Sequence, residues 1–134
     1  MTMNAIVVDT NVLIEFLEKD NRITELLGQY DKLLIPAAVD AEFRAGLDTS
    51  TKSGYRGARL LDEMLGDDTL DFLSVGRDES LKYAMLYRVL RQQGTPIPIN
   101  DIWIAATALV RNVPVCTFDK HFRRVPLLQV VAAQ

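Results

Sequence analysis

The feature of this chain that most constrains its fold is a short apolar run that ends in an acid. Residues 5–8 (AIVV) are apolar and mostly β-branched, Asp9 follows at once, and apolar residues then recur at helical spacing from Val12 to Leu17. This pattern predicts a buried strand that delivers Asp9 at its carboxyl end, directly before a helix. Ligands bind at the carboxyl edge of the strands in open α/β sheets, so an acid at this place is suited to chemistry.

Strand-like and helix-like segments alternate along the rest of the chain. The alternation predicts a mostly parallel central sheet flanked by helices, an α/β/α sandwich. With 134 residues, of which 49% are hydrophobic, the chain can bury one core, and we expect a single domain over residues 1–134. The predicted strands after the first span residues 32–36, 70–75, 115–117 and 128–132, and the predicted helices after the first run through Leu27 and over residues 37–47, 53–64, 78–93 and 100–112.

Composition excludes several classes of protein. The net charge of −3 argues against a protein that holds nucleic acid by a general positive field, although a local basic groove remains possible. The single cysteine, Cys116, excludes an internal disulfide framework and a cysteine metal site, and its apolar neighbours indicate an inert core thiol. No apolar stretch approaches the roughly 18 residues of a membrane span, and the first strand lacks the basic flank of a signal peptide. We therefore expect a cytoplasmic protein with no membrane partner.

Four acids, Asp9, Glu42, Asp101 and Asp119, follow strands or begin helices in this prediction. Each has an ordinary explanation alone: Asp9 and Asp101 suit helix starts, Asp119 can pair with Arg123 at i+4, and Glu42 suits a solvated helix surface. Together they are harder to explain, because burying several like charges costs free energy unless a cation neutralises them. An all-oxygen carboxylate set suits Mg²⁺ or Mn²⁺.

Other residues near these acids have weaker signals. His121, beside Lys120 in a predicted loop, is interpreted as exposed and uninvolved in the chemistry, and Trp103 as a core or dimer contact within an apolar helix. The helix over residues 78–93 carries apolar residues on more than one face, which predicts either an interface with another chain or full burial. Candidate contacts to substrate phosphates are Arg44, Lys52, Arg56, Arg59, Lys120, Arg123 and Arg124.

Taken in order, four segments resemble the PIN domain, and within it the VapC-type ribonuclease toxins of prokaryotic toxin–antitoxin pairs. The resemblance covers nearly the whole chain, and each segment alone would be a weak signal. It implies a PIN-like fold. The segments are residues 8–14 (VDTNVLI), 42–47 (EFRAGL), 100–108 (NDIWIAATA) and 117–122 (TFDKHF).

The resemblance also implies roles for residues. Asp9, Glu42 and Asp101 correspond to the family's core metal-binding acids, and Asp119 corresponds to its more variable fourth acid. The implied activity is that of an Mg²⁺- or Mn²⁺-dependent endoribonuclease toxin that leaves 5′-phosphate and 3′-hydroxyl ends. The implied partners are an RNA substrate, a VapB-like antitoxin that inserts into the active-site groove, and a second copy of the chain. Polar residues implied to orient the acids are Thr10, Asn11, Asn100 and Thr117.

Alternative functions remain open at this point. Two classes outside the PIN family are disfavoured. A receiver-type signalling domain would need a phosphorylatable aspartate on its third strand, and none is suitably placed here. A haloacid-dehalogenase-like phosphatase would need an aspartate where this chain has Asn11. Two PIN alternatives are compatible with the motifs. One is a catalytically silent module that binds RNA or protein, and the other is a non-toxin PIN nuclease of RNA maturation.

Overall fold

A computed structural model describes residues 4–134, so the first three residues of the expected domain lie outside it. Five strands form one sheet in the order β3-β2-β1-β4-β5, and every neighbouring pair is parallel. Val7 in the central strand is registered with Leu34 on one side and Val115 on the other. The predicted α/β class with a mostly parallel sheet is therefore confirmed. The strands are β1 Ala5–Val8, β2 Lys32–Pro36, β3 Leu70–Leu73, β4 Val115–Thr117 and β5 Val130–Ala132.

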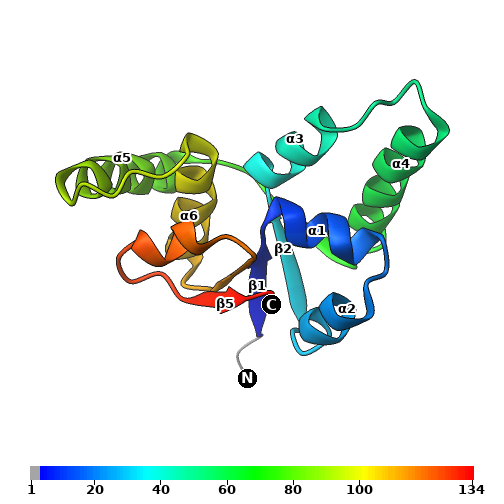
Figure 1. Cartoon of the computed structure of the whole chain (residues 1–134), viewed down its shortest axis with the longest axis horizontal. Helices are drawn as coiled ribbons and strands as arrows, with labels where there is room; N and C mark the ends of the chain where they lie inside the picture. Colours follow the sequence, from blue (N-terminus) through cyan, green and yellow to red (C-terminus); the bar gives the residue numbers. More distant parts are fainter. Residues whose placement is uncertain (1–3) are drawn as a thin grey trace.

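Helices flank the sheet on both sides. Figure 1 shows α5 and α6 on one side of β1 and β2, and α1, α2 and α4 on the other. Within residues 4–134, no helix is both long enough and apolar enough to cross a bilayer. The α-helices are α1 Thr10–Leu17, α2 Asn21–Leu27, α3 Ala37–Ala45, α4 Lys52–Gly66, α5 Arg77–Gln92 and α6 Ile99–Arg111, and a 3-10 helix, η1, spans Lys120–Arg124.

The ends of three strands bring different parts of the sequence to one edge of the sheet. Asp9 follows β1 directly, α3 begins directly after β2, and Asp119 lies two residues beyond β4. Parallel strands have their carboxyl ends at the same edge, so these three segments meet there. Helix α3 also packs against α1 and α6, and this contact brings Glu42 and the first turn of α6 to the same edge.

Helices α5 and α6 form a tightly packed pair. Trp103 of α6 stacks on Tyr83 of α5 with ring centroids 4.1 Å apart, so the predicted role of Trp103 in packing is confirmed. Glu79 is buried in the same interface, 3.2 Å from Arg111. Helix α5 is not fully buried, because Leu81 is 57% exposed. Of the two explanations for its apolar surplus, full burial is therefore wrong.

Candidate metal centre

All four acids singled out from the sequence line one open cleft at the carboxyl edge of the sheet. The cleft has a volume of about 480 Å³. The acids come from four separate places in the chain: the N-cap of α1, the body of α3, the first turn of α6 and the N-cap of η1. The residues that line it are Asp9, Thr10, Asn11, Glu42, Pro98, Ile99, Asn100, Asp101 and Asp119.

Asp9 is the most deeply placed of the four carboxylates. Its Oδ1 accepts a hydrogen bond of 2.8 Å from the backbone N–H of Thr10, and its Oδ2 accepts one of 2.7 Å from the hydroxyl of Thr117. Burial raises the pKa of Asp9, while these two hydrogen bonds lower it and the charges of Glu42 and Asp119 raise it further. The carboxylate is therefore held in one orientation, and it forms no ion pair with a basic side chain in the part of the chain that the structure describes.

Glu42 reaches the cleft from α3 and is fixed by residues far away in the sequence. Its Oε1 accepts a hydrogen bond from the hydroxyl of Thr10, and its Oε2 accepts one of 3.3 Å from the side-chain amide of Asn100. Of the polar residues named with the acids, Thr10, Asn100 and Thr117 all donate to acid side chains. Asn11 lines the cleft and is exposed.

Asp101 lies in the first turn of α6 with its side chain 14% exposed. Burial and the charges of Asp9 and Asp119 together raise its pKa to about 6, and the neighbouring His121 imidazole acts in the opposite direction. The Asp119 side chain is more exposed, and its backbone N–H donates to the Thr117 hydroxyl at 2.9 Å. Thr117 thus connects Asp9 to the loop that carries Asp119.

His121 lies beside two acids of the cleft, a position that the sequence interpretation missed. Its Nδ1 lies 3.0 Å from Oδ2 of Asp119 and 3.6 Å from Oδ2 of Asp101, so the side chain lies against the acids, in η1 and not in the predicted loop. The pairing of Asp119 with Arg123 at i+4 is also absent among the described ion pairs. Asp119 instead caps η1, accepting the backbone N–H of His121 at 2.9 Å. A helix signal after Asp119 would have placed His121 beside the acid, but the five residues of η1 are too few to show a periodicity.

The donor set fits a divalent cation. Asp101, Asp119 and His121 each offer one ligand atom, and these atoms lie within 4.8 Å of one another. Nδ1 of His121 is buried and has no hydrogen-bond partner among the described residues. A buried nitrogen without a hydrogen-bond partner among residues 4–134, beside acids whose charges raise one another's pKa, is the arrangement that a bound cation would satisfy.

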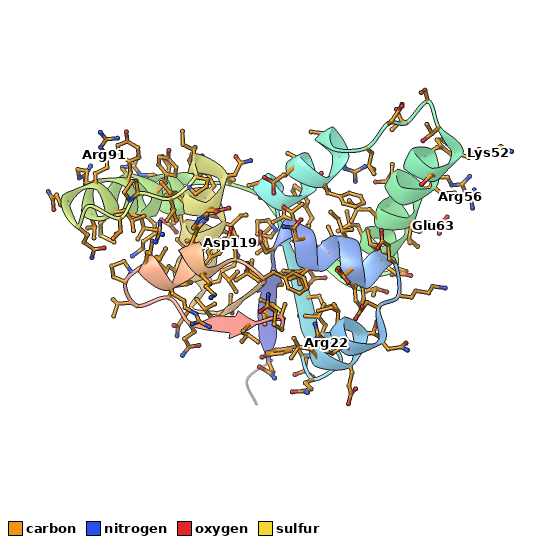
Figure 2. All side chains as sticks on the ribbon, in the orientation of Figure 1. Arg22, Lys52, Arg56, Glu63, Arg91 and Asp119 are labelled. Carbon is orange, nitrogen blue, oxygen red and sulfur yellow. The ribbon has the colours of Figure 1, made fainter. Side chains whose placement is uncertain are left out.

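The basic residues named from the sequence are dispersed over the molecule. Arg44 forms ion pairs of 2.8 Å with Asp40 and 2.7 Å with Asp62, and the Asp40 contact is the first cause of the raised pKa of its guanidinium. Lys120 and Arg123 line a small pocket together with Asp119, next to the cleft. Figure 2 shows Lys52 and Arg56 on α4, well away from Asp119, whereas Arg59 lies 3.6 Å from Glu63 and Arg124 donates to the carbonyl of Pro96.

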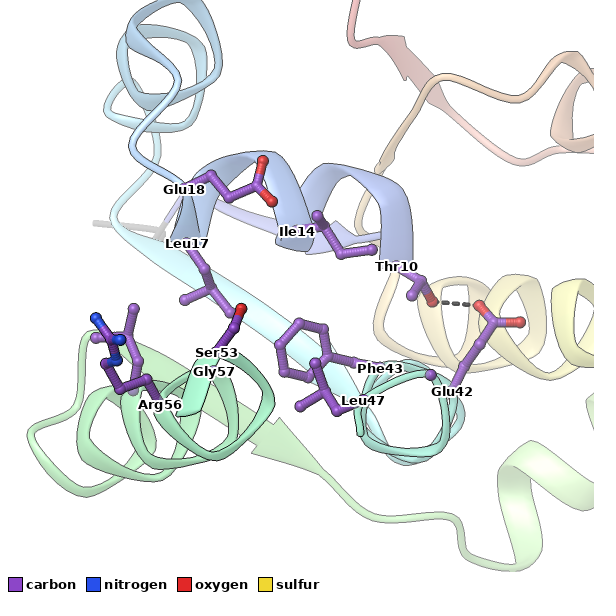
Figure 3. Close-up of a pocket in the computed structure, with 12 residues that line it drawn as sticks. Thr10, Ile14, Leu17, Glu18, Glu42, Phe43, Leu47, Ser53, Arg56 and Gly57 are labelled. Atoms are coloured by element: carbon purple, nitrogen blue, oxygen red, sulfur yellow. Dashed lines mark hydrogen bonds between the residues drawn. The ribbon is translucent and has the colours of Figure 1, made fainter. Parts of the chain in front are cut away.

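A second cavity adjoins the acidic cleft. It has a volume of about 350 Å³ and lies between α1, α3 and α4 (Figure 3). Thr10 and Glu42 belong to both cavities, so one end of this groove opens at the acids. Its walls are mainly apolar, formed by Ile14, Leu17, Phe43, Leu47 and Leu60, with Glu18, Gly46, Ser53, Arg56 and Gly57 completing the lining.

Comparison with known proteins agrees with this geometry. The PIN domain family matches residues 6–128. The chain is 31% identical over 127 residues to Ribonuclease VapC of Rickettsia bellii, with 94% of each chain covered. It is 35% identical over 123 residues to Ribonuclease VapC5 of Mycobacterium tuberculosis, covering 87% of this chain and 84% of the relative.

Solved structures give the same result. The fold is similar to that in VapBC2 of Rickettsia felis bound to a promoter DNA fragment, with a TM-score of 0.82, 25% identity, and 96% and 98% of the two chains covered. It is also similar to that in VapBC-5 of Mycobacterium tuberculosis, a member of the VapBC family of toxin–antitoxin systems, with a TM-score of 0.73, 30% identity, and coverage of 96% and 97%. The chain therefore belongs to the PIN domain family and, within it, to the VapC ribonuclease toxins.

Proposed function

We propose that this protein is a divalent-metal-dependent endoribonuclease toxin that hydrolyses RNA phosphodiester bonds. The observation that carries the proposal is the convergence of Asp9, Glu42, Asp101 and Asp119 on one cleft, in a chain that belongs to the VapC ribonucleases. Carboxylate oxygens are the ligands that Mg²⁺ and Mn²⁺ prefer. Asp9, Asp101 and Asp119 would hold the metal, and Glu42 would hold it or accept a proton.

The chain's own groups prepare the site before any substrate enters. When bound, the divalent ion supplies Lewis-acid activation of water and of the scissile phosphate. Thr117 and the Thr10 N–H orient the two oxygens of Asp9. Thr10 and Asn100 hold Glu42 at the cleft, where its carboxylate can accept a proton from attacking water. Asn11 lines the cleft, where its amide can donate to the substrate.

Phosphate contacts near the cleft fall to Lys120 and Arg123. Both lie beside Asp119, so their charges can reach the RNA backbone on either side of the scissile bond. Arg56 and Arg59 on α4 would contact a longer substrate. Arg44 remains a proposed contact, although its ion pairs with Asp40 and Asp62 compete with phosphate.

The groove between α1, α3 and α4 is the proposed site of a VapB-like antitoxin. Its apolar walls suit the apolar face of a peptide segment, and Glu42 at its inner end would let that segment reach the acids. The solved relatives that support this partner are VapBC complexes. Replacing Leu47 in the groove wall with aspartate should weaken capture of the antitoxin encoded beside this protein. Unchanged capture would locate the antitoxin on another surface.

We further propose that the protein acts in the cytoplasm as a homodimer.

The proposal is tested by incubating antitoxin-free protein with total RNA, with Mg²⁺ or Mn²⁺ or with a chelator, and mapping the cleaved ends. Asp9→Asn and Asp101→Asn are the test variants. Asp68→Asn is the matched control, because Asp68 is exposed and precedes β3, at the opposite edge of the sheet from the cleft.

Metal-dependent cuts that leave 5′-phosphates, made by the wild type and Asp68→Asn but lost in both test variants, are the expected result. Cleavage that persists in Asp9→Asn or in chelator would contradict the proposed chemistry. Absence of cleavage by the wild type on every RNA would favour a silent PIN module. Cleavage restricted to precursor ends would favour a nuclease of RNA maturation.

A further inference from the structure

The imidazole of His121 occupies an unusual position for a side chain with no assigned role. Its Nδ1 is buried and faces two carboxylates, at 3.0 Å from Asp119 and 3.6 Å from Asp101, yet it forms no hydrogen bond with any described residue. A histidine that merely oriented Asp119 would donate Nδ1–H to it in hydrogen-bond geometry. The contact has the distance of such a bond but not its directionality.

The position of His121 is well determined by its surroundings. Its backbone N–H donates to Oδ1 of Asp119, and the next residue, Phe122, is fully buried and anchors η1. Helix η1 also packs against α6, which carries Asp101. The backbone of His121 is therefore held beside both acids, within reach of its imidazole.

The distances from Nδ1 to the two carboxylate oxygens are close to those between ligands of one metal ion. Two adjacent ligands of an octahedral ion with bonds of about 2.1 Å lie about 3.0 Å apart, and tetrahedral ligands lie about 3.4 Å apart. The measured separations from Nδ1 are 3.0 Å and 3.6 Å. The first equals the octahedral spacing, and the second is about 0.2 Å longer than the tetrahedral one.

We propose that Nδ1 of His121 is a nitrogen ligand of a metal subsite that it shares with Asp101 and Asp119. This inference rests on the proposed metal-dependent function and extends it to the identity of the ion. Imidazole is a common ligand of transition metals, whereas Mg²⁺ prefers oxygen. The subsite therefore favours a transition-metal ion such as Mn²⁺ over Mg²⁺.

The test is electron spin-echo spectroscopy of Mn²⁺ bound to the full chain without a histidine tag. The chain contains one histidine, so nitrogen coupling of an imidazole to Mn²⁺ reports on His121 alone. We expect ¹⁴N modulation in the wild type, replacement of its frequencies by those of ¹⁵N when histidine is ¹⁵N-labelled, and loss in His121→Asn.

Metal affinity gives a second readout. Asparagine offers an oxygen near the position of Nδ1, so His121→Asn should weaken Mn²⁺ binding at least about tenfold while changing Mg²⁺ binding less than about threefold. The control is again Asp68→Asn, which removes an exposed charge at the opposite edge of the sheet. Its Mn²⁺ affinity should stay within threefold of the wild type.

The outcomes separate a failure of the proposed His121 ligand from a failure of the proposed metal-dependent function. Mn²⁺ that binds the wild type without imidazole coupling would overturn the role of His121 and leave the carboxylate site intact. Equal losses of Mn²⁺ and Mg²⁺ affinity in His121→Asn would overturn the metal preference. Failure of the wild type to bind either ion would overturn this inference together with the proposed metal-dependent function.

Discussion

Asp101 carries a proton more readily in the folded protein than in the unfolded chain, because burial and two neighbouring acids raise its pKa from 3.8 to about 6. Below both values the group is protonated in both states and has no effect on stability. As the pH rises from about 4 to 6, the unfolded chain ionises first, so the metal-free fold loses stability. One pKa unit corresponds to about 1.4 kcal/mol, which sets the loss at about 2 to 3 kcal/mol.

The first prediction is that the metal-free protein is less stable at pH 7 than at pH 5. In chelator, the wild type should melt at a lower temperature at pH 7 than at pH 5, and Asp101→Asn should raise the melting temperature at pH 7 and reduce the difference. Saturating Mn²⁺ should stabilise the wild type at pH 7 more than it stabilises Asp101→Asn, because ligands stabilise the state that binds them. Calorimetry at both pH values measures this. An Asp101→Asn variant less stable than the wild type at pH 7 would contradict it.

The second prediction concerns the buried hydroxyl of Thr117. Its hydroxyl donates to Asp9 and accepts the backbone N–H of Asp119, so it joins two proposed metal ligands. Thr117→Val should weaken Mn²⁺ binding about 10- to 100-fold, as loss of a group that orients metal ligands does. Thr107→Val is the matched control, because Thr107 is also buried but its hydroxyl donates only to the carbonyl of Trp103 in its own helix. Titration calorimetry that shows equal affinities in both variants would contradict this role.

Some of these residues could be placed from the sequence and others could not. Asp9 follows a run of apolar residues that fixes both its strand and its place at the sheet edge. The contacts of Glu42 with Thr10 and Asn100 join positions 32 and 58 residues apart, and only the packing of α3 against α1 and α6 creates them. His121 lies in η1, whose single buried residue, Phe122, gives no periodic signal. Local patterns therefore predicted the acids, while the groups that orient them depend on tertiary contacts.

For helix α4 the sequence predicted the helix itself but not the packing of the loop before it. Its residues predicted a helix over 53–64, and the structure has Lys52–Gly66. The pattern did not show why a glycine stands at position 54. A β-carbon there would lie 1.9 Å from the carbonyl oxygen of Asp48, because the loop before α4 folds back onto its first turn. The loop therefore requires glycine at this position.

The third prediction compares two glycines of α4. Gly54→Ala should destabilise the protein by about 2 kcal/mol or more, because the backbone of the loop must move to relieve the clash. Gly66→Ala is the control, since a β-carbon there meets no atom within 4 Å, and alanine should be neutral or should stabilise the helix by up to about 1 kcal/mol. Urea denaturation measures both changes. Equal free energies of unfolding for the two variants would show that the loop yields freely.

The α5–α6 pair presents an apolar surface to solvent. Leu81 and Met85 are 57% and 42% exposed, and they line a shallow pocket with Leu109 and Val110. Glu79 and Arg111 stiffen the pair from within. Contiguous exposed apolar residues on a rigid element are typical of protein interfaces, and homodimer interfaces are more apolar than ordinary surface.

The last prediction assigns the proposed homodimer contact to this face. A Leu81→Asp, Met85→Asp double variant should sediment as a monomer at concentrations where the wild type is a dimer, because burying two carboxylates opposite a second copy costs more than the contact gains. Its melting temperature at low protein concentration should stay close to that of the wild type, since both side chains are already exposed. Leu127→Asp is the control: Leu127 is 95% exposed and outside this pocket, so its loss should leave the dimer intact. A double variant that remains dimeric would place the contact on another surface, and a wild type that sediments as a monomer would remove the homodimer from the proposal.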